Sequence, residues 1–322
     1  MYASDPAPVI RGSEFARART LDANALDPLL RAIGGTPLLP LVRLTEAAEG
    51  SFELWAKAEF LNPTGSVKDR AALEIVRDGL GSGALGAPQV LLDASSGNTG
   101  VAYAMLGARL GFGVELCLPR NASPERVARM RAYGAELIFT DPGEGTDGAQ
   151  REARQRATAN PDRYWYPDQY NNPSNPLAHY RHTGPEIWEQ TSGRVTDLVV
   201  GVGTGGTISG TGRYLKERRS DIRVVGVEPA GPVHGLEGLK HLPSALRPST
   251  YDAQIVDATV RIETEAAQEM QRRLAREEGL AVGVSSAAAV AAALEVGGSR
   301  PGAVIVTLLP DADRRFTIEE DR

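Results

Sequence analysis

The chain has 322 residues, 42% of them hydrophobic and 24% charged, which is enough for two globular domains of ordinary size. Its formal net charge of −6, without a basic cluster, argues against nucleic-acid binding. Its single cysteine, Cys117, lies in an apolar run and predicts a buried core thiol, which excludes a disulfide framework and a cysteine-based metal site.

The N-terminal residues 1–25 mix arginine and acidic side chains without an apolar centre. They predict a polar extension rather than a secretory signal. No apolar run in the chain reaches the length of a membrane span. We therefore expect a cytoplasmic protein without membrane contact.

The next part of the chain alternates short apolar strands with helices. Because the strands are apolar throughout rather than half polar, they predict a parallel sheet covered by helices on both faces. The predicted strands are 52–59, 89–94, 113–119 and 135–140, and the predicted helices are 67–78, 124–133, 144–159 and one that follows the turn 95–100 and runs to about residue 110.

Around 165–176 the composition changes to Tyr, Asn, Pro and Gln, which indicates a domain crossing. The alternation then resumes, with an irregular segment over 230–256 that is a candidate mobile loop. Strands are predicted over 196–203, 223–228 and 303–309, and helices over 207–219, 264–278 and 285–296. The sequence thus predicts an α/β fold of two domains, 26–171 and 172–322, each with a mostly parallel sheet.

Lys68 lies in the stretch Leu61–Arg70, where a turn leads into a predicted helix. Ser66 and Asp69 have the spacing of a capping box, which places Lys68 in the first helical turn. The helix dipole disfavours a charged amine there and so favours a nucleophilic one. The simplest alternative is a solvated lysine after a turn.

A glycine-rich turn over 201–207 joins a strand to a helix. Its backbone amides and the helix N-terminus predict an anion cradle suited to a phosphate. The turn also satisfies the G-x-G-x-x-G pattern, and Glu228 follows near the end of the next strand, where a ribose-binding acid is expected. A dinucleotide-binding oxidoreductase is therefore a competing interpretation.

Two more helix starts carry hydroxyl side chains. Residues 95–100, with sequence Ser-Ser-Gly-Asn-Thr-Gly, end a strand and offer a nest suited to a carboxylate, although an ordinary capped turn has the same pattern. Ser285 and Ser286 precede an alanine-rich helix, where a plain N-cap is the simpler interpretation. The four histidines show no spacing that predicts a metal site, so we expect no metal.

Taken together, a lysine, a carboxylate nest, a phosphate cradle and a serine on helix starts are what pyridoxal phosphate needs. The stretches 62–70, 95–100, 203–207 and 283–286 resemble the motifs of the fold-type II pyridoxal-phosphate enzymes. The chain is most similar to the cysteine synthases (O-acetylserine sulfhydrylases) over about 29–316, and its segments 130–138 and 169–188 are most similar to the B type.

The resemblance implies a role for each motif. Lys68 is expected to hold the cofactor as a Schiff base and then act as the base on the substrate's α-proton. Asn98 is expected to bind the 3′-oxygen, and Ser285 the ring nitrogen. The expected phosphate ligands are Gly203, Thr204, Gly205, Gly206 and Thr207, and the expected ligands of the substrate carboxylate are Ser95, Ser96, Thr99 and Gln169.

The implied reaction is a β-replacement. O-acetyl-L-serine loses acetate to give an aminoacrylate, and sulfide or thiosulfate then adds to form L-cysteine. A neutral serine at the ring nitrogen makes the ring a weaker electron sink than an aspartate would, which suits prompt elimination. The family also implies small-molecule substrates, a homodimer, and an N-terminal segment to about residue 60 that crosses over to the C-terminal domain.

The chain departs from the family pattern at Gly34, Ser95 and Ala287, where Asn, Thr and Gly are usual. The segment 231–243 also differs from the B-type pattern, and its His234, Lys240 and His241 either meet an anionic sulfur donor or face solvent. Cystathionine β-synthase or O-phosphoserine sulfhydrylase activity is the alternative on the same fold. An NAD-dependent oxidoreductase using 201–206 leaves Lys68 without a role, and the presence of Lys68 argues against a catalytically silent binding module.

Overall fold

The computed structural model describes residues 27–47 and 51–312, so the polar extension predicted over 1–25 lies outside the described residues. Contacts between residues divide this part of the chain into two compact units. The smaller unit contains Val76–Pro167, and the larger contains Asp27–Ile75 together with the residues from Asp168 onward. How these units correspond to the domains expected over 26–171 and 172–322 stays a prediction.

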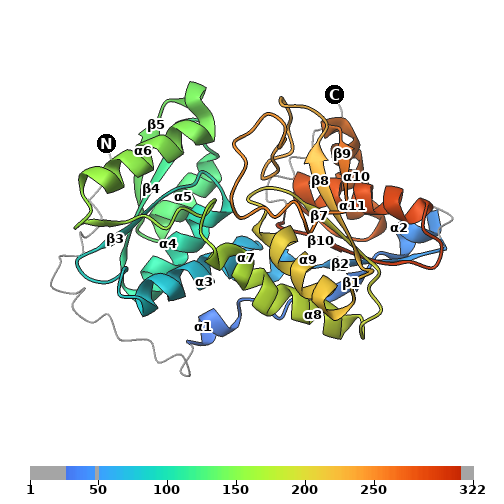
Figure 1. Ribbon diagram of the computed structural model, residues 1–322. Helices are drawn as coiled ribbons and strands as arrows, with labels where there is room; N and C mark the ends of the chain where they lie inside the picture. The colour runs from blue at the N-terminus through green and yellow to red at the C-terminus, as the bar shows by residue number, and fades with distance from the viewer. Residues whose placement is uncertain (1–26, 48–50, 313–322) are drawn as a thin grey trace. The chain divides into compact units, whose positions relative to one another are not determined.

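The larger unit is built on a six-stranded sheet (Figure 1). The strand order is β1-β2-β10-β7-β8-β9, and every neighbouring pair is parallel except β1 and β2. The sheet confirms the predicted mostly parallel α/β architecture. Its strands are β1 (Leu38–Pro40), β2 (Glu53–Lys57), β7 (Asp197–Gly201), β8 (Arg223–Pro229), β9 (Ala258–Ile262) and β10 (Val304–Leu308).

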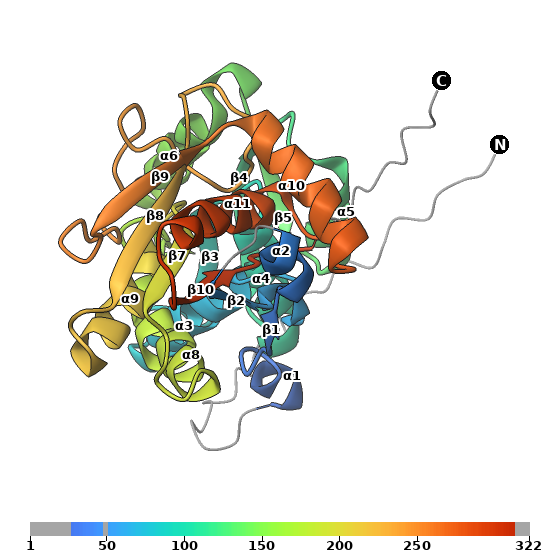
Figure 2. The same cartoon turned by 90° about the vertical axis from the view of Figure 1, so that its right-hand side faces the viewer.

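Apolar side chains on both faces of this sheet are buried, because successive residues of a strand point to opposite faces. Leu198 and Val200 share a core with Ile208 and Leu215 of α9 (Gly206–Arg218). Val199 belongs to the second core, which includes residues of α10 and α11 (Figure 2). The remaining helices of the unit are α1 (Pro28–Arg31), α2 (Val42–Ala47), η2 (Glu59–Leu61), the first half of α3 (Lys68–Gly81), α7 (Ser174–Ala178), η4 (His179–Thr183), α8 (Gly184–Gln190), α10 (Thr264–Glu277) and α11 (Val284–Gly298).

The smaller unit holds a four-stranded, wholly parallel sheet with the order β5-β4-β3-β6. Cys117 lies in its core beside Ala149 and Ala153, and burial raises the pKa of this thiol to about 12. Cys117 is therefore the buried core residue that the sequence predicts. The elements are β3 (Val90–Ala94), α4 (Asn98–Leu110), β4 (Gly113–Pro119), α5 (Pro124–Ala132), β5 (Glu136–Thr140), η3 (Pro142–Glu144), α6 (Gly145–Ala159) and β6 (Tyr164–Trp165).

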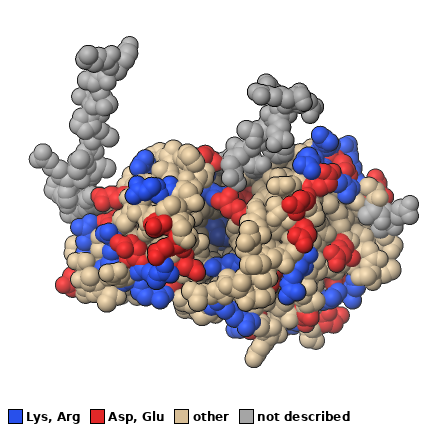
Figure 3. All heavy atoms as spheres, turned by 90° about the horizontal axis from the view of Figure 1, so that it is seen from above, with Lys and Arg blue, Asp and Glu red and all other residues tan. Residues whose placement is uncertain are grey.

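Several elements are not evident from the sequence pattern. The helices over 174–190 begin in an Asn- and Pro-rich stretch, and their apolar faces are interrupted by polar residues that turn out to be buried. The segment 230–256 is irregular as predicted, with neither helix nor strand, and its Leu236 and Leu239 belong to the core; that it is mobile stays a prediction. Over the face drawn in Figure 3, basic and acidic side chains are interspersed. Among the described helices, none has both the length and the apolar character of a membrane span.

Candidate active site

Lys68 is the first residue of α3, one residue later than the start predicted from the sequence. The N–H of Lys68 donates to Ser66 Oγ at 3.3 Å, which agrees with Ser66 as a capping residue. The carboxylate of Asp69 accepts hydrogen bonds from the N–H of Thr64, at 2.7 Å, and from its hydroxyl. The turn before Lys68 is thus held by the side chain of Asp69, which lies in the first turn of α3.

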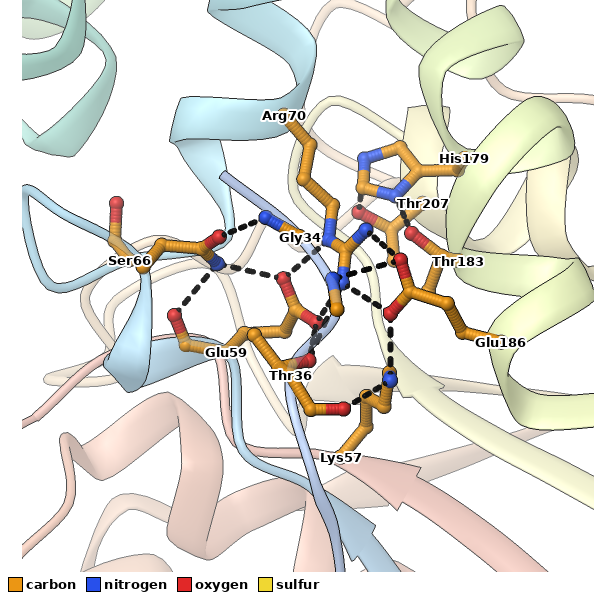
Figure 4. Close-up of polar contacts among 12 residues, drawn as sticks. Gly34, Thr36, Lys57, Glu59, Ser66, Arg70, His179, Thr183, Glu186 and Thr207 are labelled. Atoms are coloured by element: carbon orange, nitrogen blue, oxygen red, sulfur yellow. Dashed lines mark hydrogen bonds and ion pairs between the residues drawn. The ribbon is translucent and has the colours of Figure 1, made fainter. Parts of the chain in front are cut away.

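Four charged residues form ion pairs next to this turn, and we call Lys57, Glu59, Arg70 and Glu186 the charged cluster (Figure 4). The first three are buried and Glu186 is half-buried. Arg70 Nε lies 2.7 Å from Glu59 Oε2, and its Nη1 lies 2.7 Å from Glu186 Oε1. Although burial opposes ionisation of Glu186, Arg70 and Lys57 lower its pKa to about 2. This cluster was not predicted from the sequence, because its members are separated by up to 129 residues (57 to 186) and only the fold brings them together.

The glycine-rich turn connects β7 to α9, at the carboxyl end of the sheet. Each of three glycines is pressed against a neighbour so closely that a Cβ has no room. A Cβ on Gly203 would lie 2.3 Å from Gly238 O, one on Gly205 would lie 2.4 Å from Tyr251 Cβ, and one on Gly206 would lie 2.0 Å from Asn175 Oδ1. Gly205 also has φ of +86°, in the left-handed region that favours glycine.

Neutral side chains hold this turn in place. Asn175 Nδ2 donates to Thr204 Oγ1 at 3.1 Å and to the carbonyl of Gln169 at 2.9 Å. His179 Nε2 lies 3.1 Å from Thr207 Oγ1, and its Nδ1 lies 2.9 Å from Thr183 Oγ1. Complete burial lowers the pKa of His179 well below 6.5, so this imidazole is neutral. Neither residue was singled out from the sequence; for the histidines a surface or structural role was expected, and the role of His179 is structural.

Ser285 is the second residue of α11 and is 5% exposed. The start of α11 is held by the segment that follows β10, because Gly283 N donates to Asp311 O at 3.0 Å and Ser286 Oγ donates to it at 3.2 Å. The same segment holds the Lys68 turn, since Val67 N donates to Pro310 O at 2.8 Å. Two of the predicted helix starts are therefore fixed to one short segment of the larger unit.

The predicted carboxylate nest lies in the smaller unit, between β3 and α4. Ser95 Oγ accepts a hydrogen bond from Gly100 N at 2.8 Å, so this hydroxyl caps the start of α4. Ser95 and Thr99 are buried, whereas Ser96 and Asn98 are half-buried. The larger unit thus holds Lys68, Gln169, Gly203–Thr207 and Ser285, and the smaller unit holds Ser95, Ser96, Asn98 and Thr99.

Glu228, which the nucleotide interpretation requires, lies in β8 and is 4% exposed. Burial raises the pKa of its carboxyl group. A ribose-binding acid has to reach its ligand, and this buried side chain is poorly suited to that role. Within the described ranges, no group of three or more His, Cys, Asp or Glu residues has an arrangement that holds a metal ion.

Comparison with known proteins gives a consistent family. Residues 29–311 match the family described as pyridoxal-phosphate dependent enzyme. The chain is 47% identical over 297 residues to the cysteine synthase of Aquifex aeolicus, covering 91% of each chain. It is 42% identical over 291 residues to cysteine synthase B of Salmonella typhimurium, covering 90% of this chain and 94% of the relative. The solved structure of O-acetyl serine sulfhydrylase isoform 3 from Entamoeba histolytica is similar with a TM-score of 0.85 and 33% identity, covering 94% of this chain and 96% of that one.

Proposed function

Because the chain belongs to the family of pyridoxal-phosphate-dependent enzymes, we propose that it is a cysteine synthase that forms L-cysteine from O-acetyl-L-serine and sulfide. Relatives named cysteine synthase match nine-tenths of the chain. The substrates are small molecules. We further propose that the enzyme acts as a homodimer in the cytoplasm.

The observation that carries the proposal is the turn over Gly203–Thr207. Its three glycines each bring the backbone against a neighbouring group, with 2.0–2.4 Å from the position of a Cβ to the nearest atom. The first N–H groups of α9 have no acceptor within the helix, and the helix dipole favours an anion at this end. Backbone donors, two threonine hydroxyls and neutral supports fit the phosphate group of pyridoxal phosphate.

Lys68 is the residue that we assign to the cofactor's aldehyde. The chain has four lysines, and Lys68 is the one at the start of a helix, whereas the other three lie in a strand, near a helix end and in a loop. Lys57 is 2.6 Å from Glu186, Lys216 is 2.7 Å from Asp257, and Lys240 lies over the ring of Tyr170 at 4.9 Å. The start of α3 places Lys68 where a neutral amine is favoured over a charged one.

When bound, pyridoxal phosphate supplies an electron sink that makes the α-proton of the amino acid acidic. Lys68 Nζ would take that proton as the acetate leaves. Ser285 would present a neutral hydroxyl to the ring nitrogen, and Asn98 would bind the 3′-oxygen. The substrate carboxylate would be bound by the hydroxyls of Ser95, Ser96 and Thr99 and by the amide of Gln169.

The proposal is tested with purified enzyme by recording its visible spectrum, adding O-acetyl-L-serine, and then adding sulfide. We expect a cofactor band that shifts to longer wavelength with O-acetyl-L-serine and returns with sulfide, while L-cysteine accumulates. A band that responds only to O-phosphoserine, or to serine with homocysteine, would move the activity to an alternative on the same fold. A protein without a cofactor band after incubation with pyridoxal phosphate would contradict the proposal.

A further inference from the structure

We propose that Arg70 is a positioning residue, and that through the charged cluster it fixes the orientation of the first turn of α3 and therefore the direction of Lys68. This inference rests on the proposed function in one respect, that Lys68 is the attachment point of pyridoxal phosphate. It assigns to the cluster a task that differs from stabilising the fold.

Helix geometry links the directions of the Lys68 and Arg70 side chains. Lys68 and Arg70 are two residues apart at the start of α3. Each residue of an α-helix turns by about 100°, so these two side chains leave the helix in nearly opposite directions. If the side chain of Arg70 is held in place, the rotation of this first turn about the helix axis is fixed. The direction of Lys68 is then fixed as well.

Several hydrogen bonds hold the guanidinium of Arg70. Its guanidinium forms paired hydrogen bonds with Glu59, at 2.7 and 2.8 Å, and with Glu186, both at 2.7 Å. Nη2 also lies 3.2 Å from Thr36 Oγ1. Figure 4 shows the guanidinium between the two carboxylates. Paired contacts on two sides of a planar group fix its orientation, which a lysine ammonium cannot reproduce.

The two carboxylates that bind Arg70 are themselves held by separate elements. Glu59 belongs to η2 and accepts from Thr36 Oγ1 at 2.7 Å and from Asn62 Nδ2 at 2.9 Å. Glu186 belongs to α8 and accepts from Gly35 N at 3.0 Å. It also pairs with Lys57 of β2 at 2.6 Å. Arg70 is thus anchored directly to η2 and α8, and through Glu186 to β2.

The free-energy balance of the charged cluster favours a role in orientation over a role in stability. The side chains of Lys57, Glu59 and Arg70 are no more than 1% exposed, and that of Glu186 is 20% exposed. Removing charges from water costs free energy that offsets much of the stabilisation from their pairing. Such a cluster is therefore weak evidence for a contribution to stability. The directional contacts among the two cations and two anions instead fix the orientation of Arg70. Gly34 fits the same arrangement, since a Cβ there would lie 2.8 Å from Arg70 Nη1.

The test compares Arg70→Lys with wild-type enzyme and with Arg300→Lys as a matched control. Arg300 pairs at 3.1 Å with the buried Asp197, which lies at the opposite, amino end of the sheet. Each protein is freed of cofactor and mixed with pyridoxal phosphate. The measurements are the unfolding midpoint, the rate of covalent attachment at Lys68 (trapped with borohydride and located by mass spectrometry), and kcat and KM for O-acetyl-L-serine.

We expect Arg70→Lys to attach the cofactor about tenfold more slowly and to lose kcat by a similar factor, because a small misplacement of a reacting group is enough for such a loss. KM should stay within about twofold. Arg300→Lys, which changes a 40% exposed side chain away from α3, should keep the wild-type attachment rate. Arg70→Lys that attaches as fast as Arg300→Lys would overturn the inference. Wild-type enzyme without attachment at Lys68 would instead contradict the proposed function.

If Arg70→Lys does not fold, Glu186→Asp replaces it. The shorter side chain keeps the charge but cannot reach Arg70 and Lys57 together, so we expect attachment to slow by about threefold. An unchanged rate in folded Glu186→Asp would overturn the inference as well.

Discussion

The starts of α3 and α9 solve the same problem, a fixed helix terminus, by different means. At α3 the turn is held by the charged cluster, with Arg70 between Glu59 and Glu186. At α9 the turn is held by neutral groups, including Asn175 and a neutral His179, and by glycines packed against their neighbours. A phosphate brings its own charge to the helix dipole, so its site needs exposed backbone donors more than side-chain charges. A lysine at a helix start is not stabilised by the helix dipole, so other contacts have to fix the direction of its side chain.

Replacement of the lysine should have the largest effect. Lys68→Ala removes the attachment point and the proposed base, and a positioned proton-transfer group alone contributes roughly 10²–10⁴-fold. We expect at least that loss in kcat for L-cysteine formation. Lys240→Ala is the control that should keep its cofactor band, and a Lys68→Ala enzyme with near wild-type turnover would refute the assignment.

Loss of space at the α9 start should have the next largest effect. In Gly206→Ala the new Cβ meets Asn175, which is held by Gln169 and Thr204 and cannot move aside without breaking those bonds. We expect the dissociation constant of pyridoxal phosphate to rise about 10–100-fold, measured on the cofactor-free protein by equilibrium dialysis. Gly298→Ala is the matched control, because nothing lies within 4 Å of its Cβ position.

The neutral support of α9 predicts a pH dependence. His179 has its pKa well below 6.5 in the folded protein because it is buried, so protonation near pH 6.5 favours the unfolded chain. Its contribution to stability is therefore complete above this pH and is lost as the pH falls, by about 1.4 kcal/mol per unit well below it.

Urea unfolding of wild-type protein and His179→Gln between about pH 7.5 and 5.5 measures this effect. The other histidines are common to both proteins, so the difference isolates His179. The wild-type free energy of unfolding should fall more steeply with acid. Equal slopes would mean that the pKa of His179 is not lowered in the folded protein.

The smallest effect is expected at the start of α11. Ser285→Ala removes one neutral hydrogen bond to the proposed ring nitrogen, which corresponds to roughly a 2–10-fold change in kcat. The cofactor band should remain, since Lys68 and the α9 start are intact. A loss as large as that of Lys68→Ala would show that Ser285 has more than this role.

The sequence predicts the fold well where local patterns are strong. Apolar strands such as 113–119 and helix starts such as Ser66–Lys68 have signals that lie within a few residues of one another. Other contacts join residues that are distant in the sequence. His179 and Thr207 are 28 positions apart, and within the charged cluster Glu59 and Arg70 are 11 positions apart across a turn. Such contacts depend on the packing of several elements, and no local pattern encodes them.

The central claim, that Lys68 carries the cofactor, is tested most directly by reducing wild-type enzyme with borohydride in the presence of pyridoxal phosphate and mapping the labelled peptide. The chain has only four lysines, so the assignment is unambiguous. The account predicts the label on Lys68 alone, at about one per chain. Label on Lys57, Lys216 or Lys240 in place of Lys68, or no label at all, would contradict it.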